Sequence, residues 1–133
     1  MNDNETAGFL SLLLDHGFKF AEHQKLYVEI ASRCAPGVNI SALSEVRAFI
    51  LGWVFSHTNL YIKHNSTLAA ISGVPRTTLI ERGLECFRQS LKLNPEKAKA
   101  KNMITVMASE LMELYIDAGD FDKAMKIYSD FNT

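Results

Sequence analysis

Several residue types that constrain a fold chemically are scarce in this 133-residue chain, which has two cysteines, three prolines and one tryptophan. Two cysteines are too few for the disulfide framework of a small secreted domain, so Cys34 and Cys86 are expected to be reduced and half-buried. The apolar stretch at 10–14 is too short for a membrane span or a signal-peptide core, and charged residues follow it at once. The sequence therefore predicts a cytoplasmic protein with no membrane partner.

A strong charge of either sign is also missing, because 14 Lys and Arg residues nearly balance 15 Asp and Glu residues. The distribution is nevertheless uneven. Residues 61–102 carry eight basic residues against three glutamates, a local balance of +5, and the remainder is acidic. A basic middle between acidic ends is the pattern expected of a nucleic-acid-binding lobe on an acidic platform.

Motifs typical of enzymes are absent as well. The histidines at 16, 23, 57 and 64 lie outside any HExxH, CxxC or phosphate-binding glycine pattern. Solvated or packed histidines explain all four. We therefore expect no catalytic residues, no metal and no cofactor.

Residues 67–79 have the spacing of a helix-turn-helix. Small and apolar residues fill a short first helix, Gly73 tolerates a positive φ where that helix ends, and Pro75 suits the first position of a second helix. In this motif the first turn of the second helix meets base edges in the major groove, where it would present Arg76, Thr77 and Thr78. The alternative is an ordinary corner between two packed helices.

A lysine-rich segment follows the second helix, which is expected to end near Gln89. Residues 91–93 alternate apolar and charged, residues 94–96 favour a turn, and residues 103–107 have the β-branched content of a strand. Two strands joined by a basic loop would form a wing whose lysines neutralise DNA phosphates. The alternative is a solvated helix that begins near Pro95.

In the order and spacing of these segments, residues 8–130 resemble the MarR family of dimeric bacterial transcription regulators, chiefly through Arg76-Thr77-Thr78-Leu79 and its distance to Ile104-Thr105. The resemblance implies a mainly α fold with a small β-hairpin, that is, a winged helix-turn-helix with N- and C-terminal dimerisation helices. The single domain 1–133 would place the DNA-binding lobe at 41–107 between dimerisation helices at 1–40 and 108–133. The implied function is sequence-specific regulation by a homodimer on a pseudo-palindromic operator in double-stranded DNA, with an effector unknown.

Three sets of residues follow from this interpretation. The expected DNA-binding residues are Pro75, Arg76, Thr77, Thr78, Arg82, Arg88, Lys92, Lys97, Lys99 and Lys101. The expected dimer interface contains Leu12, Leu13, Phe20, Tyr115, Phe121 and Tyr128. Trp53 and Phe55 belong to the core or, alternatively, line an effector pocket.

The carboxy-terminal segment 111–128 supports a rival interpretation. Its pattern Leu-x-x-x-Tyr-x-x-x-Gly-Asp-Phe-x-x-Ala-x-x-x-Tyr resembles a tetratricopeptide helix pair, which would make the chain a protein-interaction module. No 34-residue period is found upstream, although such arrays need about three repeats to bury their faces. The two interpretations differ in one respect that a structure can test: the repeat module is wholly helical, whereas the wing requires β-structure.

Overall fold

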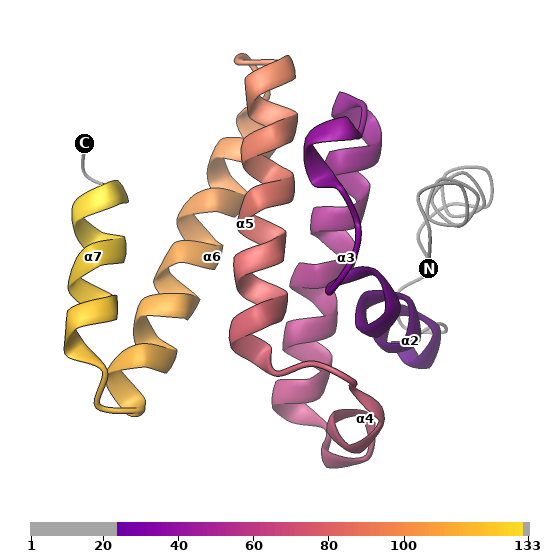
Figure 1. Cartoon of the computed structure of the whole chain (residues 1–133), viewed down its shortest axis with the longest axis vertical. Helices are drawn as coiled ribbons and strands as arrows, with labels where there is room; N and C mark the ends of the chain where they lie inside the picture. Colours follow the sequence, from indigo (N-terminus) through magenta and orange to yellow (C-terminus); the bar gives the residue numbers. More distant parts are fainter. Residues whose placement is uncertain (1–23, 132–133) are drawn as a thin grey trace.

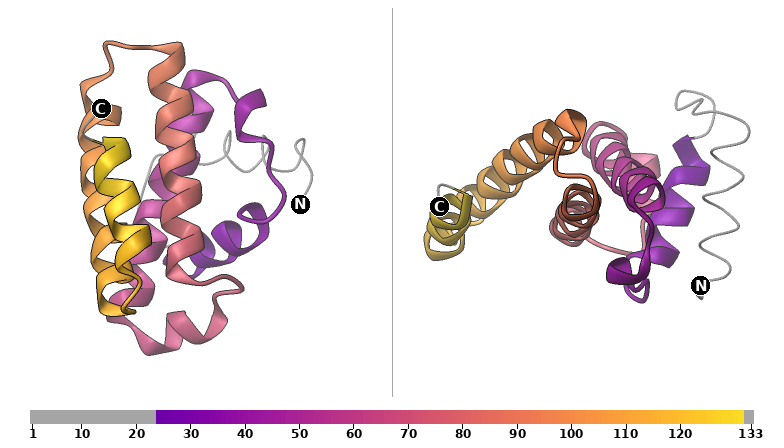
Figure 2. Two further views of the ribbon diagram at one scale, coloured as in Figure 1. Left: turned by 60° about the vertical axis from the view of Figure 1, so that its left-hand side comes forward. Right: turned by 90° about the horizontal axis from the view of Figure 1, so that it is seen from above.

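The structure is a computed structural model that describes residues 24–131, and all of the regular structure in this range is helical. The elements in order are α2 (Gln24–Cys34), the 3-10 helix η2 (Ile40–Ala42), α3 (Glu45–His64), α4 (Ser66–Ile71), α5 (Arg76–Leu93), α6 (Ala98–Asp117) and α7 (Phe121–Phe131). Helices α3, α5, α6 and α7 form a row of antiparallel neighbours, and α2 and α4 pack beside α3 (Figure 1). Seen from above, α3 and α7 lie at the two ends of this row, and α5 and α7 lie on the same side of α6 (Figure 2).

Local capping residues define the ends of α3 and α4. The Ser44 side chain accepts a hydrogen bond from the Arg47 amide, and Glu45 places a negative charge in the first turn of α3, where the helix dipole favours it. At the other end, the Asn65 side chain accepts hydrogen bonds from the amides of Thr67 and Leu68 at the start of α4. The chain can therefore turn at Asn65 without leaving the first amides of α4 unsatisfied.

The predicted wing is wrong, because residues 24–131 contain no strand. Helix α5 continues beyond Gln89 to Leu93, and a short loop then leads into α6. Within the expected second strand, 103–107, Met103 and Ile104 pack against the core and Met107 is buried, which is the spacing of one helix face. Packing at this period outweighs the β-branched content of the segment.

Helix α5 lies in the middle of the row and is buried on two sides, against α3 and against α6. Its buried residues are Leu79, Ile80, Gly83, Leu84, Cys86, Phe87 and Ser90. The approach to α3 is close, since a Cβ atom at Gly52 would lie 3.0 Å from Cys86 Cβ and from the Phe87 ring. The predicted second helix therefore exists, but it is the central helix of the bundle.

The turn between α6 and α7 depends on Gly119, whose φ of 77° is the left-handed conformation that glycine adopts without strain. The Asp120 side chain accepts a hydrogen bond from the Lys123 amide and so caps the first turn of α7. The segment 111–128, which resembles a helix pair in sequence, is therefore divided between two helices at this turn. The other expected turn differs, because Gly73 has no positive φ; α4 ends at Ile71, and Ser72 after it is extended.

Three residues of the expected dimer interface, Leu12, Leu13 and Phe20, lie outside the described residues. Cys34 and Cys86 are both buried within the α2–α3–α5 core, more deeply than the half-burial expected of them. None of the helices described in residues 24–131 is long and apolar enough to cross a membrane.

Candidate functional site

Arg76, the first of the expected base-reading residues, is held within the protein. Its Nε donates a hydrogen bond to Asn59 Oδ1 at 2.7 Å, and its Nη2 lies 3.1 Å from Glu110 Oε2. Lys63 also pairs with Glu110, at 3.3 Å. Arg76 therefore links the start of α5 to both α3 and α6, and 23% of its side chain is exposed.

Two further basic residues assigned to DNA also make internal contacts. The Arg82 guanidinium donates to the backbone carbonyls of Ala35 and Val38, at 2.7 and 2.5 Å, and so fixes the segment that follows α2. Lys97 lies 2.5 Å from Glu45 Oε1, and its ammonium group sits 4.2 Å from the centre of the Phe49 ring. Burial of these charges requires such partners. Arg82 therefore holds the segment after α2 against α5, and Lys97 links the start of α6 to the start of α3.

The remaining expected DNA-binding residues are not gathered on one surface of α5. Thr77 and Thr78 are half-buried, while the exposed residues are Pro75, Arg88, Lys92, Lys99 and Lys101. Both candidates for an effector pocket pack in the bundle: Phe55 is fully buried, and the Trp53 ring lies 4.6 Å from His57, measured between centroids. The first turn of α5 therefore presents no extended basic face.

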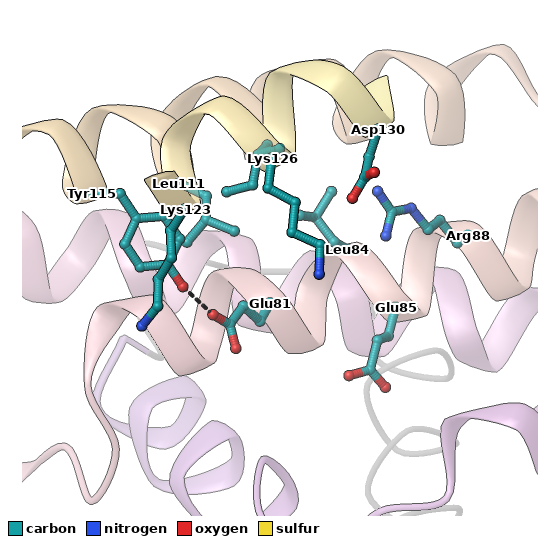
Figure 3. A pocket seen from close by; sticks show the side chains of 10 residues that line it. Glu81, Leu84, Glu85, Arg88, Leu111, Tyr115, Lys123, Lys126 and Asp130 are labelled. Atoms are coloured by element: carbon teal, nitrogen blue, oxygen red, sulfur yellow. Dashed lines mark hydrogen bonds between the residues drawn. The ribbon is translucent and has the colours of Figure 1, made fainter. Parts of the chain in front are cut away.

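A groove does exist elsewhere, between α5 and α7, with α6 as its floor (Figure 3). Its volume is about 420 Å³. The lining residues are Glu81, Leu84, Glu85 and Arg88 from α5, Leu111 and Tyr115 from α6, and Lys123, Lys126, Ile127 and Asp130 from α7. The apolar members form the floor, and the charged members form two walls. This combination of an apolar base and a few polar groups is typical of binding sites.

The two walls carry opposite charges at each level of the groove. Helices α5 and α7 run in the same direction because each is antiparallel to α6. Glu81 and Lys123 therefore lie near one end, whereas Arg88 and Asp130 point toward one another at the other end (Figure 3). The six charged lining residues comprise three acids and three bases, so the groove has no net charge.

Tyr115 joins the floor of the groove to its acidic wall. Its hydroxyl donates a hydrogen bond to Glu81 Oε1 at 2.5 Å, and this bond, followed by burial, raises the pKa of Tyr115 to about 12. Lys123 approaches the same ring, with its ammonium group 5.4 Å from the centroid, and it also lies 3.5 Å from Asp120. The first turn of α7 is thus tied to α6 at the end of the groove where Glu81 lies.

No family model, curated protein or solved structure matches this chain. Since the walls of the groove balance in charge, the groove does not attract a polyanion such as DNA electrostatically.

Sequence reasoning missed this groove, although its signal is present in the printed chain. Glutamates at 81 and 85 and an arginine at 88 repeat at helical spacing, and the segment 123–130 carries the opposite signs at similar spacing. These charges face each other only because the fold places α5 and α7 as parallel walls of one groove. The internal partners of Arg76, Asn59 and Glu110, had no such signal because they lie 17 and 34 residues away.

The described members of the expected dimer interface are found in two different settings. Tyr115 is half-buried and bonded to Glu81, so its hydroxyl serves the contact between α6 and α5. Phe121 and Tyr128 are 62% and 55% exposed on α7. They lie on a different face of α7 from the residues that line the groove.

Proposed function

We propose that this chain is a helical protein-interaction module whose α5–α6–α7 groove binds an amphipathic segment of a partner protein. The observation that carries the proposal is the apolar floor between two walls of opposite charge. An isolated apolar cleft would accept many ligands, whereas this arrangement selects a ligand with charges on both of its edges. The helical fold of residues 24–131 is the one expected of the repeat-like interpretation.

The chemistry of the partner segment follows from the walls. Its apolar side chains would cover Leu84, Leu111 and Ile127, while basic groups on one edge would meet Glu81 and Glu85. Acidic groups on its other edge would meet the lysines of α7. A volume of about 420 Å³ accommodates a few side chains, so the segment is short.

DNA-binding regulation by a homodimer is the second candidate, and one observation favours it. Lys92, Lys99 and Lys101 are exposed around the connection between α5 and α6. Exposed lysines of this kind support sequence-independent affinity for phosphates, and they do not supply base readout. For either candidate we propose a cytoplasmic location, which the buried thiols of Cys34 and Cys86 favour.

The proposed function can be tested with a designed helical peptide of about 14 residues, which spans about 20 Å. The peptide carries leucines along one side, lysines along one edge of that side and glutamates along the other. Two control peptides keep the leucines and carry either lysine or glutamate on both edges. In fluorescence anisotropy titrations the mixed peptide should bind at least about tenfold more tightly than either control, a difference of about 1.4 kcal/mol.

A matched pair of protein variants identifies the site of binding. Lys123→Glu with Lys126→Glu makes both walls acidic at this end, so the preference should switch to the peptide with lysine on both edges. The control, Lys99→Glu with Lys101→Glu, makes the same change of charge on exposed positions of α6 and should leave the preference unchanged. If the three peptides bind within about twofold of each other to all three proteins, the groove does not select its ligand as proposed.

The DNA-binding candidate is tested separately by a mobility-shift titration. The DNA that flanks the protein's own gene is compared with random duplex at two salt concentrations. Binding that is equal on both duplexes and weakens steeply with salt indicates nonspecific phosphate contacts by the exposed lysines. Tight binding to the flanking DNA alone would instead favour the regulator over the interaction module.

A further inference from the structure

A second, smaller hollow adjoins the groove at α5. Its volume is about 270 Å³. The residues that line it are Ile40 and Ser41 of η2 and Glu85, Arg88, Gln89 and Lys92 of α5. Glu85 and Arg88 also line the groove, so the two hollows meet along this edge of α5 (Figure 3). We call the second one the η2 hollow.

The η2 hollow carries a net positive charge, whereas the groove carries none. Its charged residues are one acid, Glu85, and two bases, Arg88 and Lys92. Glu85 already has a partner, since its Oε2 lies 2.8 Å from Nη1 of Arg82. Arg88 and Lys92 are both exposed and lie four residues apart, so they present two positive charges on one face of α5. The η2 hollow therefore favours an acidic ligand.

The rim formed by η2 is held against α5 by hydrogen bonds. The Gln89 side-chain amide donates to the backbone carbonyls of Ser41 and Leu43, at 3.2 and 3.1 Å. The Arg82 guanidinium holds the segment that precedes η2 in the same way, through two backbone carbonyls. Because these contacts fix the hollow before a ligand arrives, binding requires little further ordering of the protein.

We propose that the partner segment in the groove continues past Arg88 into the η2 hollow, where its acidic side chains lie beside Arg88 and Lys92. This inference rests on the proposed function and extends it to the end of the bound segment. Lys92 lies one turn beyond Arg88, about 6 Å along α5, and four extended residues span about 13 Å. Asp130 points toward Arg88 from the other wall (Figure 3), whereas Lys92 lines the η2 hollow alone.

The acids of a polypeptide fit this position better than the phosphates of DNA. A polyanion on this face would also meet Glu81, Glu85 and Asp130, which line the adjoining groove. A segment that is acidic only at one end places its charges at Arg88 and Lys92 and keeps them away from Glu81. The occupant is therefore a polypeptide with a stretch of mixed charge in the groove and an acidic end.

Four-residue extensions of the mixed peptide test this inference. The extension contains two glutamates, two lysines or two glutamines and is placed at either end of the peptide. In fluorescence anisotropy titrations at low salt, the glutamate extension at one end should bind about fivefold more tightly than the glutamine extension, as expected of two exposed charge pairs. The other end should show no such gain, because Glu81 and Lys123 offset each other there. The advantage should shrink at high salt.

Charge reversal in the protein locates the bound acids. Arg88→Glu with Lys92→Glu should reverse the preference at that end, so that the lysine extension binds more tightly than the glutamate extension. Lys92→Gln alone should reduce the glutamate advantage to about twofold. The control, Lys99→Glu with Lys101→Glu, makes the same change of charge on exposed positions of α6 and should keep the glutamate preference.

The outcomes separate this inference from the proposed function. If the unextended peptide binds as proposed but the glutamate and glutamine extensions bind within about twofold of each other at both ends, this inference alone is wrong. If the unextended peptide shows no preference over the control peptides, both are wrong. Random duplex DNA at equal concentration should not displace the glutamate-extended peptide. Displacement that Lys92→Gln abolishes would overturn the inference and assign the η2 hollow to phosphates.

Discussion

Arg76 shows how one residue can satisfy a sequence motif while serving another purpose. Its guanidinium reaches Asn59 on α3 and Glu110 on α6 from the first turn of α5. Glu110 is more deeply buried than Arg76, with 16% of its side chain exposed. Loss of the guanidinium would leave this carboxylate with Lys63 alone, and Asn59 without its charged donor.

We therefore expect Arg76→Met, which keeps most of the aliphatic stem, to lower the free energy of unfolding by about 2 kcal/mol. Urea denaturation followed by circular dichroism measures this change. Arg88→Met is the control of the same residue type, and at an exposed position it should change stability by less than about 0.5 kcal/mol. Similar stabilities for the two variants would show that Arg76 does not tie the three helices together.

Individual residues also show which features of this protein could be predicted from its sequence and which could not. A second helix starting at Pro75, found to start one residue later at Arg76, and a helix pair over 111–128 could be predicted because caps, glycine and proline act through neighbouring residues. The partners of Arg82 and Lys97 lie 44 to 52 residues away along the chain. The neighbouring sequence does not show whether a basic residue binds a distant carbonyl or carboxylate of the same chain or binds a phosphate.

Helices α3 and α5 approach each other closely at the point where Gly52 of α3 faces Cys86 and Phe87 of α5. A methyl group at Gly52 would lie 3.0 Å from Cys86 Cβ, an atom that cannot move without the backbone of α5. Glycine in the middle of a helix costs about 1 kcal/mol relative to alanine, so its presence here reflects the close approach of the two helices.

Gly52→Ala should consequently destabilise the protein by about 1 kcal/mol, because overpacking of 1–3 kcal/mol exceeds the gain in helix propensity. The measurement is again urea denaturation. Gly37→Ala is the matched control, since no atom lies within 4 Å of the added methyl group and its stability should be equal to or slightly above that of the wild type. An increase in stability for Gly52→Ala would mean that α3 and α5 are less tightly packed than described.

Element type in the segment 91–107 was the main error of the sequence analysis. Alternation over three residues and a β-branched run favoured strands, while the same residues also fit a helix that begins after Pro95. Short apolar runs do not distinguish a strand from a helix. Here the segment is helical because its apolar residues pack against α5 at helical spacing. The alternative given for this segment, a lysine-bearing helix, is the structure that is found.

In the molecule as a whole, a row of packed helices stands where the sequence analysis expected a DNA-binding lobe with a wing. The 13Cα secondary shifts of the full chain should be positive throughout 98–107, because this range lies within α6. Far-UV circular dichroism should show a helical spectrum without a β contribution from this range. Negative shifts at Met103–Met107 would restore the strand and, with it, the wing.

The length of the α6–α7 turn sets which surface of the last helix faces which neighbour. One added residue between Ala118 and Phe121 would rotate α7 by about 100° about its own axis. Such a rotation would move Lys123 and Lys126 out of the groove wall and carry Phe121, Met125 and Tyr128 away from their exposed positions. We therefore expect homologous chains to vary in length at the loop 94–97 and to keep the turn around Gly119 constant.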